Sequence, residues 1–257
     1  MMRETKAAIV AAKRAGSIAV KSLRKNMAFK EKSSHSDLVT KTDVLVENAI
    51  VSFLSKKFPD YGFLAEESGE TGVADCKWIV DPIDGTNNFI AGIPYFCTAI
   101  ALQKNGLTVS GIVFDPLRKE LFVAEKGKGA FLNGKRIMVS KKTELREFIC
   151  ITSIRAGLPG EPWLQRQERF LRLYPLVRSV RMFGASELDL CWLATGRVDA
   201  FVHFNVFPWD GAAGALIVRE AGGTATDEKG NLWEISKKVL IATNGRRHKE
   251  FLGILGL

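Results

Sequence analysis

The 257-residue sequence predicts a layered α/β protein, because helical and strand periods follow one another along it in two different arrangements. In residues 3–27 apolar and small side chains recur every three or four positions, which predicts an amphipathic helix. From Phe63 the pattern changes to short apolar runs separated by turns, which is typical of strands. Beyond about residue 147 helical and strand segments alternate. The length suits one large domain or two units that share an interface.

The first half contains two helices and then a run of strands. After the helix over 3–27 we expect an exposed polar loop at 30–37 and a helix over 43–58, which Pro59 ends. Asn105-Gly106 and Asn133-Gly134 predict hairpin turns. The strands of this half are expected at 78–80, 96–102, 109–114 and 120–125.

The second half alternates helices with strands, and no linker separates it from the first half. A boundary near 140–147 is expected to divide an N-terminal α+β unit, 1–145, from a C-terminal α/β unit, 146–257, which completes the site. The expected helices lie at 161–173, 186–195, 210–221 and from 246 onward, and the expected strands lie at 177–182, 199–204 and 239–243.

Composition excludes several classes of protein. The chain is 46% hydrophobic and 25% charged, which is typical of a folded globular protein and not of a disordered one. No apolar run approaches the ~20 residues that span a bilayer, and the first residues lack the apolar core of a signal peptide. The four cysteines are widely spaced and there are only three histidines, which disfavours a zinc site or a disulfide framework. We therefore expect a cytoplasmic protein with reduced thiols and no membrane partner.

Charge is distributed unevenly along the chain. The net charge is +9, yet residues 1–57 carry 12 basic and 5 acidic side chains (+7), and residues 58–90 carry 1 and 7 (−6). Charge alone leaves open a nucleic-acid partner, an anionic small substrate, or solvated helix faces. No basic run is interleaved with aromatic residues, which disfavours nucleic acid as a partner.

The acidic segment holds the first candidate site. A predicted strand delivers Asp81 at its carboxyl end, where ligands collect in layered α/β proteins, and Asp84 follows three residues later. Gly85 and Thr86 then offer backbone N–H groups suited to a phosphate. Carboxylates beside an anion site become compatible when a divalent ion such as Mg²⁺ joins them. By itself, however, this segment also reads as a turn with a helix cap.

Two further elements favour a functional site. Glu66-Glu67-Ser68 lies upstream, and Trp209-Asp210-Gly211-Ala212-Ala213-Gly214 lies downstream at an expected helix start. Together with Asp81–Phe89, they resemble the signatures of the inositol monophosphatase family, D-P-[IL]-D-G-T-x-N-[FY] and W-D-x-[AS]-[AG]-G. Asp37-Leu38-Val39-Thr40-Lys41-Thr42-Asp43 and Gly184-Ala185-Ser186 match further family elements, so the resemblance spans about residues 4 to 245.

The resemblance implies a fold, a cofactor and roles for residues. The fold is an alternating α/β/α/β/α sandwich, and the activity is Mg²⁺-dependent hydrolysis of a small phosphate monoester by a water that the metal activates. Two to three Mg²⁺ ions are implied, with the metal ligands being Glu66, Asp81, the Ile83 carbonyl, Asp84 and Asp210. The catalytic residues implied are Glu66, Thr86 and Asp43, and the substrate-binding residues are Asp84, Gly85, Thr86, Ser186, His203 and Asp210.

The substrate and the partners stay open. Inositol 1-phosphate is the first expectation; fructose 1,6-bisphosphate, NADP(H), histidinol phosphate and other sugar or nucleotide phosphates are hosted by the same scaffold. A regulatory protein that binds RNA or transcription machinery is the non-enzymatic alternative. The resemblance also implies lithium sensitivity and a homodimer, and the apolar run 96–102 is a further hint of a subunit contact.

Several single residues have two interpretations. His203 stands where many inositol-selective members carry a glutamate, seven residues before Asp210 (210 − 7), and is either a buried strand-end histidine or part of a broadened substrate pocket. Glu67 either orients a ligand or binds metal. At most one of Glu187 and Asp189 should face the site, because residues two apart on a helix point in different directions.

Three basic residues and one aromatic complete the expectations. Lys32 matches a family lysine near the third ion, but it is equally a surface residue. His35 and His248 are expected to be exposed, and Trp209 is expected to pack rather than stack on a substrate.

Overall fold

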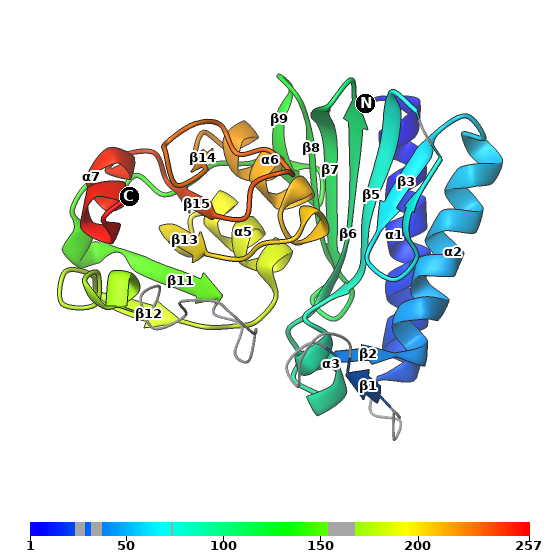
Figure 1. Ribbon diagram of the computed structural model, residues 1–257, viewed down its shortest axis with the longest axis horizontal. Coiled ribbons are helices and arrows are strands. Elements are labelled where there is room, and N and C mark those ends of the chain that lie inside the picture. Colours follow the sequence, from blue (N-terminus) through cyan, green and yellow to red (C-terminus); the bar gives the residue numbers. More distant parts are fainter. Residues whose placement is uncertain (24–28, 32–37, 73, 154–167) are drawn as a thin grey trace.

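Sheets and helices alternate in five layers in the computed structural model, which describes residues 1–23, 29–31, 38–72, 74–153 and 168–257 (Figure 1). Helices α1 (Arg3–Ser22) and α2 (Lys41–Lys57) cover one face of an eight-stranded sheet. Helices α5 (Ser186–Ala194) and α6 (Ala212–Glu220) lie between that sheet and a five-stranded one, and α7 (His248–Leu255) covers the far face. The expected α/β/α/β/α sandwich is confirmed.

The eight-stranded sheet carries the acidic segment near its middle. Its order is β10-β9-β8-β7-β6-β5-β3-β4, and β3 and β5 are the parallel pair. Asn105, Gly106, Asn133 and Gly134 all have positive φ, which confirms the hairpin turns. The strands are β3 (Gly62–Ala65), β4 (Gly69–Thr71), β5 (Cys76–Asp84), β6 (Cys97–Lys104), β7 (Leu107–Asp115), β8 (Glu120–Glu125), β9 (Gly129–Leu132) and β10 (Lys135–Ile137).

The five-stranded sheet has the order β12-β11-β13-β15-β14, with β11 parallel to both of its neighbours. Its strands are β11 (Ile149–Ser153), β12 (Ser179–Arg181), β13 (Ala200–His203), β14 (Thr224–Thr226) and β15 (Leu240–Thr243). The remaining short elements are β1 (Phe29–Glu31), β2 (Leu38–Thr40), α3 (Thr86–Ala91) and the 3₁₀ turns η1 (Leu145–Glu147) and η2 (Pro208–Asp210).

Three buried apolar clusters hold the layers together. One lies between α1, α2 and the large sheet, and a second fills the space between the two sheets around α5 and α6. The third packs α7 onto the outer face of the small sheet. Burial at about 25 cal/mol per Å² makes these clusters the main stabilising contribution, and they fix α5 and α6 beside the end of β5.

Some sequence expectations need correction. Helix α2 starts at Lys41 rather than at Asp43, because Thr40 caps it: the Thr40 hydroxyl accepts the N–H groups of Thr42 and Asp43. Lys30 and Glu31 belong to β1 rather than to a loop. The run 96–102 is buried, since β6 pairs on both sides within the sheet, so the hint of a subunit contact there was wrong.

One further expectation is wrong, and others concern residues that the structure does not describe. His248 is only 8% exposed, so its expected exposure was wrong. Lys32, His35 and most of the helix expected at 161–173 lie outside the described residues. Among the helices of the described residues, none combines the length and apolar character needed to cross a bilayer.

Candidate active site

A β-bulge brings the two aspartates of the acidic segment together. Residues three apart in a regular strand point to opposite faces, but the β5–β6 register shifts between Asp81 and Asp84. Both carboxylates are buried, and both experience the charge of Asp210. The sequence spacing alone therefore gives the wrong relative orientation, which the bulge corrects.

The Asp81 carboxylate is buried in surroundings that disfavour its negative charge. Asp81 is 2% exposed, and Oδ1 has no hydrogen-bond partner among the described residues. Burial raises the pKa of Asp81 well above its usual value, and the charges of Glu66 and Asp84 raise it further. A cation would remove both penalties.

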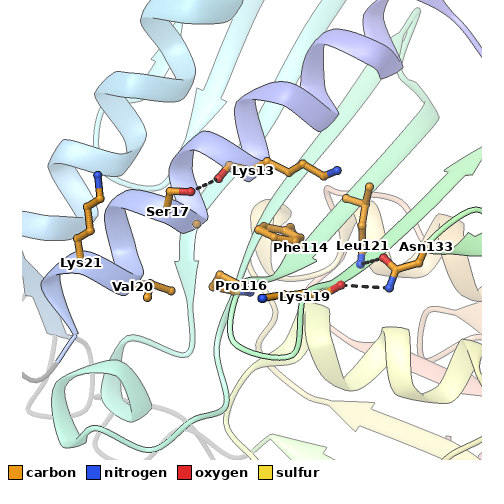
Figure 2. A pocket seen from close by; sticks show the side chains of 10 residues that line it. Lys13, Ser17, Val20, Lys21, Phe114, Pro116, Lys119, Leu121 and Asn133 are labelled. Atoms are coloured by element: carbon orange, nitrogen blue, oxygen red, sulfur yellow. Dashed lines mark hydrogen bonds between the residues drawn. The ribbon is translucent and has the colours of Figure 1, made fainter.

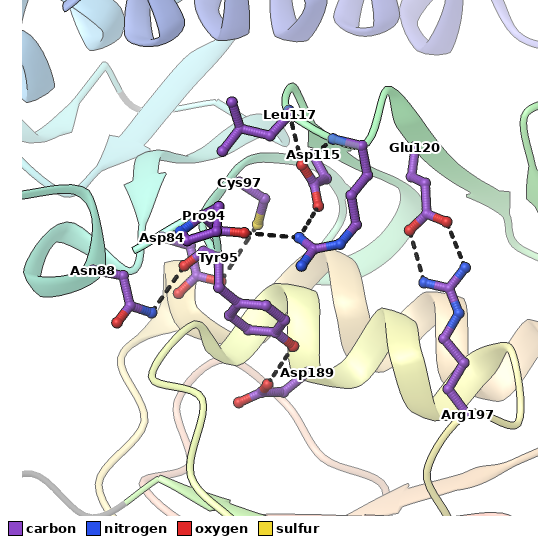
Figure 3. A network of polar contacts seen from close by, with 11 residues as sticks. Asp84, Asn88, Pro94, Tyr95, Cys97, Asp115, Leu117, Glu120, Asp189 and Arg197 are labelled. Carbon is purple, nitrogen blue, oxygen red and sulfur yellow. Dashed lines mark hydrogen bonds and ion pairs between the residues drawn. The ribbon is translucent and has the colours of Figure 1, made fainter. Parts of the chain in front are cut away.

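Asp84 is already held by a helix. Its Oδ1 accepts the N–H of Ser186 at 2.9 Å, and its Oδ2 accepts the N–H groups of Glu187 at 2.8 Å and Leu188 at 3.2 Å. Cys97 also lies 3.4 Å from Oδ2 (Figure 3). Burial raises the pKa of Asp84 to about 7, with the charge of Asp210 adding to it and the helix N–H groups opposing it. Asp84 thus caps α5 from about a hundred residues away in the sequence.

Glu66 reaches the cluster from the end of β3. Its N–H donates to the Val80 carbonyl at 3.2 Å, which aligns it beside the parallel strand β5. Buried Glu47 of α2 fixes the following turn by accepting the N–H groups of Glu67 and Ser68, both at 2.8 Å. Sequence reasoning missed Glu47; its position on the inner face of a predicted helix, where an unpaired carboxylate is costly, was the available signal.

Asp210 ends the 3₁₀ turn that precedes α6. Its Oδ2 accepts the Phe207 N–H at 2.9 Å, and it is 3% exposed. Helix α6 begins at Ala212, with Gly211 in the capping position, so the expected start at Asp210 was two residues early. A Cβ at Gly211 would lie 2.8 Å from a Leu240 methyl and 3.1 Å from the Trp233 ring, which explains the glycine.

The expected contact between Thr86 and Asp43 is present. Thr86 Oγ1 lies 3.3 Å from Asp43 Oδ1 and 3.0 Å from the Ile83 carbonyl, and both groups can accept its single proton. Asp43 Oδ2 accepts the Thr40 N–H at 2.9 Å, completing a capping box. Asp43, the third residue of α2, therefore supports the start of this helix and contacts Thr86 at the same time.

The remaining predicted substrate residues differ in their surroundings. Gly85 has φ +91° and would place a Cβ 3.1 Å from the Tyr95 carbonyl, so only glycine fits there. The Ser186 N–H is used by Asp84, which leaves its hydroxyl as the group available to a ligand. His203 is 1% exposed at the end of β13, and its ring lies edge-on to Phe201. Its role toward substrate stays a prediction.

A further carboxylate that no motif contains also lies here. Glu187 and Asp189 are both completely buried, and both feel the charge of Asp84. Asp189 accepts the Tyr95 hydroxyl at 2.7 Å (Figure 3). The two carboxylates nevertheless have different hydrogen-bond partners, since Glu187 accepts N–H groups of α6. That at most one of the pair faces the site stays a prediction. The sequence feature that pointed to Glu187 is its position in the first turn of a predicted helix, directly after the small-residue turn Gly184-Ala185-Ser186.

The donor set fits a hard divalent cation. Glu66, Asp81, Asp84 and Asp210 provide carboxylate oxygens, the ligands that Mg²⁺ prefers, and the Asp81 oxygen lacks any other partner among the described residues. Among the residues that the structure describes, no group of three or more histidine, cysteine, aspartate or glutamate side chains is already arranged to hold a metal ion.

A groove elsewhere on the molecule has different chemistry. It has a volume of about 550 Å³ and lies between α1 and the β7–β8 region, with Lys13, Lys21 and Lys119 around an apolar floor that includes Phe114 (Figure 2). It contains no carboxylate, so the acidic cluster, and not this groove, is the candidate active site.

The chain is similar to known proteins over nearly its whole length. The model of the inositol monophosphatase family matches residues 1–255. Inositol monophosphatase 1 of Solanum lycopersicum is 40% identical, with 97% of this chain and 93% of the relative covered. Nus factor SuhB of Pasteurella multocida is 38% identical, with 95% and 92% covered. A Thermotoga maritima protein named fructose-1,6-bisphosphatase/inositol-1-monophosphatase is 38% identical, with 88% and 85% covered.

A comparison with solved structures leads to the same family. The crystal structure of extragenic suppressor protein suhB from Bartonella henselae has a TM-score of 0.92 and 38% identity, with 97% of each chain covered. The matched residues include every element that contributes to the acidic cluster. This chain belongs to the inositol monophosphatase family, whose members are phosphatases.

Proposed function

We propose that this protein hydrolyses phosphate monoesters of small polyols in a Mg²⁺-dependent reaction. Inositol 1-phosphate is the leading candidate substrate. The observation that carries the proposal is the orphaned, buried Oδ1 of Asp81 among the carboxylates of Glu66, Asp84 and Asp210. Such a cluster is unfavourable in an empty state and favourable around a divalent ion.

The residues that would hold the ions are Glu66, Asp81, the Ile83 carbonyl, Asp84 and Asp210. Bound Mg²⁺ would neutralise the phosphate and make the attacking water more acidic. Thr86 would orient that water: because its proton is donated to Asp43 or to the Ile83 carbonyl, its oxygen keeps lone pairs that can accept a hydrogen bond from the water. A threonine hydroxyl is too weak a base to act alone, so its role is orientation.

The phosphate has few helix N–H groups to bind. Asp84 already accepts the first N–H groups of α5, and Glu187 accepts those of Ala213 and Gly214 in α6. These contacts support a reaction in which the metal ions, rather than the N-termini of α5 and α6, supply most of the phosphate binding.

The leaving group is the least constrained part of the substrate. With His203 where the inositol-selective pattern has a glutamate, we propose a broadened specificity that includes sugar bisphosphates, and the name of the Thermotoga maritima relative supports it. The name of the Pasteurella multocida relative supports a second role with transcription machinery. We further propose a homodimer and, from the four free cysteines, a cytoplasmic location.

Phosphate release from a panel of phosphomonoesters tests the proposal. Inositol 1-phosphate and fructose 1,6-bisphosphate are compared at saturating Mg²⁺ and in EDTA, with wild type and Asp81→Asn. Asp81 is the most informative position, because its buried Oδ1 has no hydrogen-bond partner among the described residues that the substitution would remove. We expect turnover only with Mg²⁺ and at least a hundredfold loss in the variant. Loss of less than about tenfold, which is ~1.4 kcal/mol, would contradict the metal assignment.

A further inference from the structure

Glu187 connects the two helices that face the acidic cluster. It lies in the first turn of α5, is completely buried, and belongs to neither signature motif. A buried carboxylate is costly unless its oxygens are satisfied. The positions of its oxygens therefore show what it does.

Each Glu187 oxygen accepts a backbone N–H from the first turn of α6. Oε1 accepts the Ala213 N–H at 3.0 Å, and Oε2 accepts the Gly214 N–H. A Cβ at Gly214 would lie 2.6 Å from Oε2, so the glycine lets the carboxylate approach the helix end. Glu187 thus acts as the N-terminal cap of α6, although it belongs to another helix.

The same residue is tied to Asp84. The Glu187 N–H donates to Asp84 Oδ2 at 2.8 Å. A continuous path of hydrogen bonds therefore runs from Asp84 through the first turn of α5 and the Glu187 side chain to α6, which begins two residues after Asp210. Burial raises the pKa of Glu187 well above its usual value, and the charge of Asp84 raises it further.

We propose that Glu187 is a positioning residue that fixes the N-termini of α5 and α6 against each other and so sets the separation of Asp84 and Asp210 for a shared divalent cation. The inference rests on the proposed metal site. A purely structural cap would stabilise the protein equally with and without the ion, whereas a positioning residue affects the affinity for the ion itself.

The experiment compares three variants of the full chain with wild type. Glu187→Gln keeps the length of the side chain but loses its charge and one of its two acceptors, and Glu187→Ala removes the cap. Asp189→Asn is the matched control: it changes a second buried carboxylate of α5 that contacts Tyr95 instead of α6, and the amide oxygen can still accept the hydroxyl. Mg²⁺ binding is measured without substrate, by titration calorimetry and by the rise in Tm that Mg²⁺ causes.

We expect the Kd for Mg²⁺ to rise by about tenfold or more in both Glu187 variants and by less than about twofold in Asp189→Asn. The Mg²⁺-induced rise in Tm should shrink only in the Glu187 variants, and turnover should recover toward wild type at high Mg²⁺. An unchanged Kd in a folded Glu187 variant would overturn the proposal, as would failure of both Glu187 variants to fold, which would show a structural role.

The two proposals fail in different ways. If wild type binds Mg²⁺ but hydrolyses no phosphomonoester, the proposed function fails while the Kd comparison still decides the role of Glu187. If wild type binds no Mg²⁺, both are overturned.

Discussion

His248 makes the stability of this protein dependent on pH far from the acidic cluster. It is the first residue of α7 and is 8% exposed, with Nε2 2.8 Å from Thr226 Oγ1 and Nδ1 3.0 Å from Thr243 Oγ1. Both hydroxyls can donate or accept, so the neutral ring is fully satisfied in either tautomer. Burial lowers the pKa of His248 to about 4. The charged residues that line one cavity together with His248 are Lys229, Arg246, Arg247, Lys249 and Glu250.

The sign and size of the effect follow from linkage. Above the unfolded pKa of about 6.5 the histidine is neutral in both states and costs nothing. Below it, the unfolded chain binds a proton that the folded protein binds only near pH 4, so stability falls as the pH falls. The slope is about 1.4 kcal/mol per pH unit, and the full loss is about 3 kcal/mol.

Urea denaturation at pH 7.5 and pH 4.5 of wild type and His248→Gln measures this effect. Glutamine keeps a donor and an acceptor but does not titrate, so carboxylates and the other histidines cancel in the difference between the two proteins. We expect wild type to lose about 2–3 kcal/mol more than the variant over this interval. A difference between the two losses of less than about 0.5 kcal/mol would refute the reasoning, because the histidine would then be protonated in the folded state.

Three other predictions concern the acidic cluster and the helix packing. Glu47→Ala should free the N–H groups of Glu67 and Ser68 and raise the Mg²⁺ concentration for half-maximal turnover by several-fold, whereas an unchanged Mg²⁺ curve would rule out this support. Gly16→Ala should destabilise the protein by about 1–3 kcal/mol, because the added Cβ would lie 2.8 Å from the Phe114 ring. Gly253→Ala is the control and should be neutral or stabilising, because open space surrounds the added Cβ. Equal urea midpoints for the two variants would contradict this prediction. Ca²⁺ as the sole cation should support little turnover, since it prefers more ligands and longer bonds, and Li⁺ should inhibit; full activity with Ca²⁺ alone would contradict the expectation.

The sequence by itself determined the helix and strand types and identified the acidic residues. Helical periodicity predicted α1 and α2, and the Asn-Gly pairs predicted two hairpins, because these signals depend on local geometry alone. Asp81 and Asp84 stood out as two close carboxylates at the end of a predicted strand, and Asp210 stood out through the Trp209-Asp210 motif that resembles the family signature.

Only the tertiary structure decided how those residues relate to one another. The bulge in β5 reverses the orientation that regular alternation gives to Asp84, and the cap of α5 comes from that same residue rather than from its own neighbours. The contacts of Glu187 and Glu47 could not be predicted for the same reason, since each side chain accepts N–H groups about twenty or more residues away. Burial also reversed the expectation for His248, because a helix start looks exposed in the sequence until the strands that pack against it are known. Hydrogen bonds between distant segments depend on how the layers stack, and local sequence patterns carry no information about that.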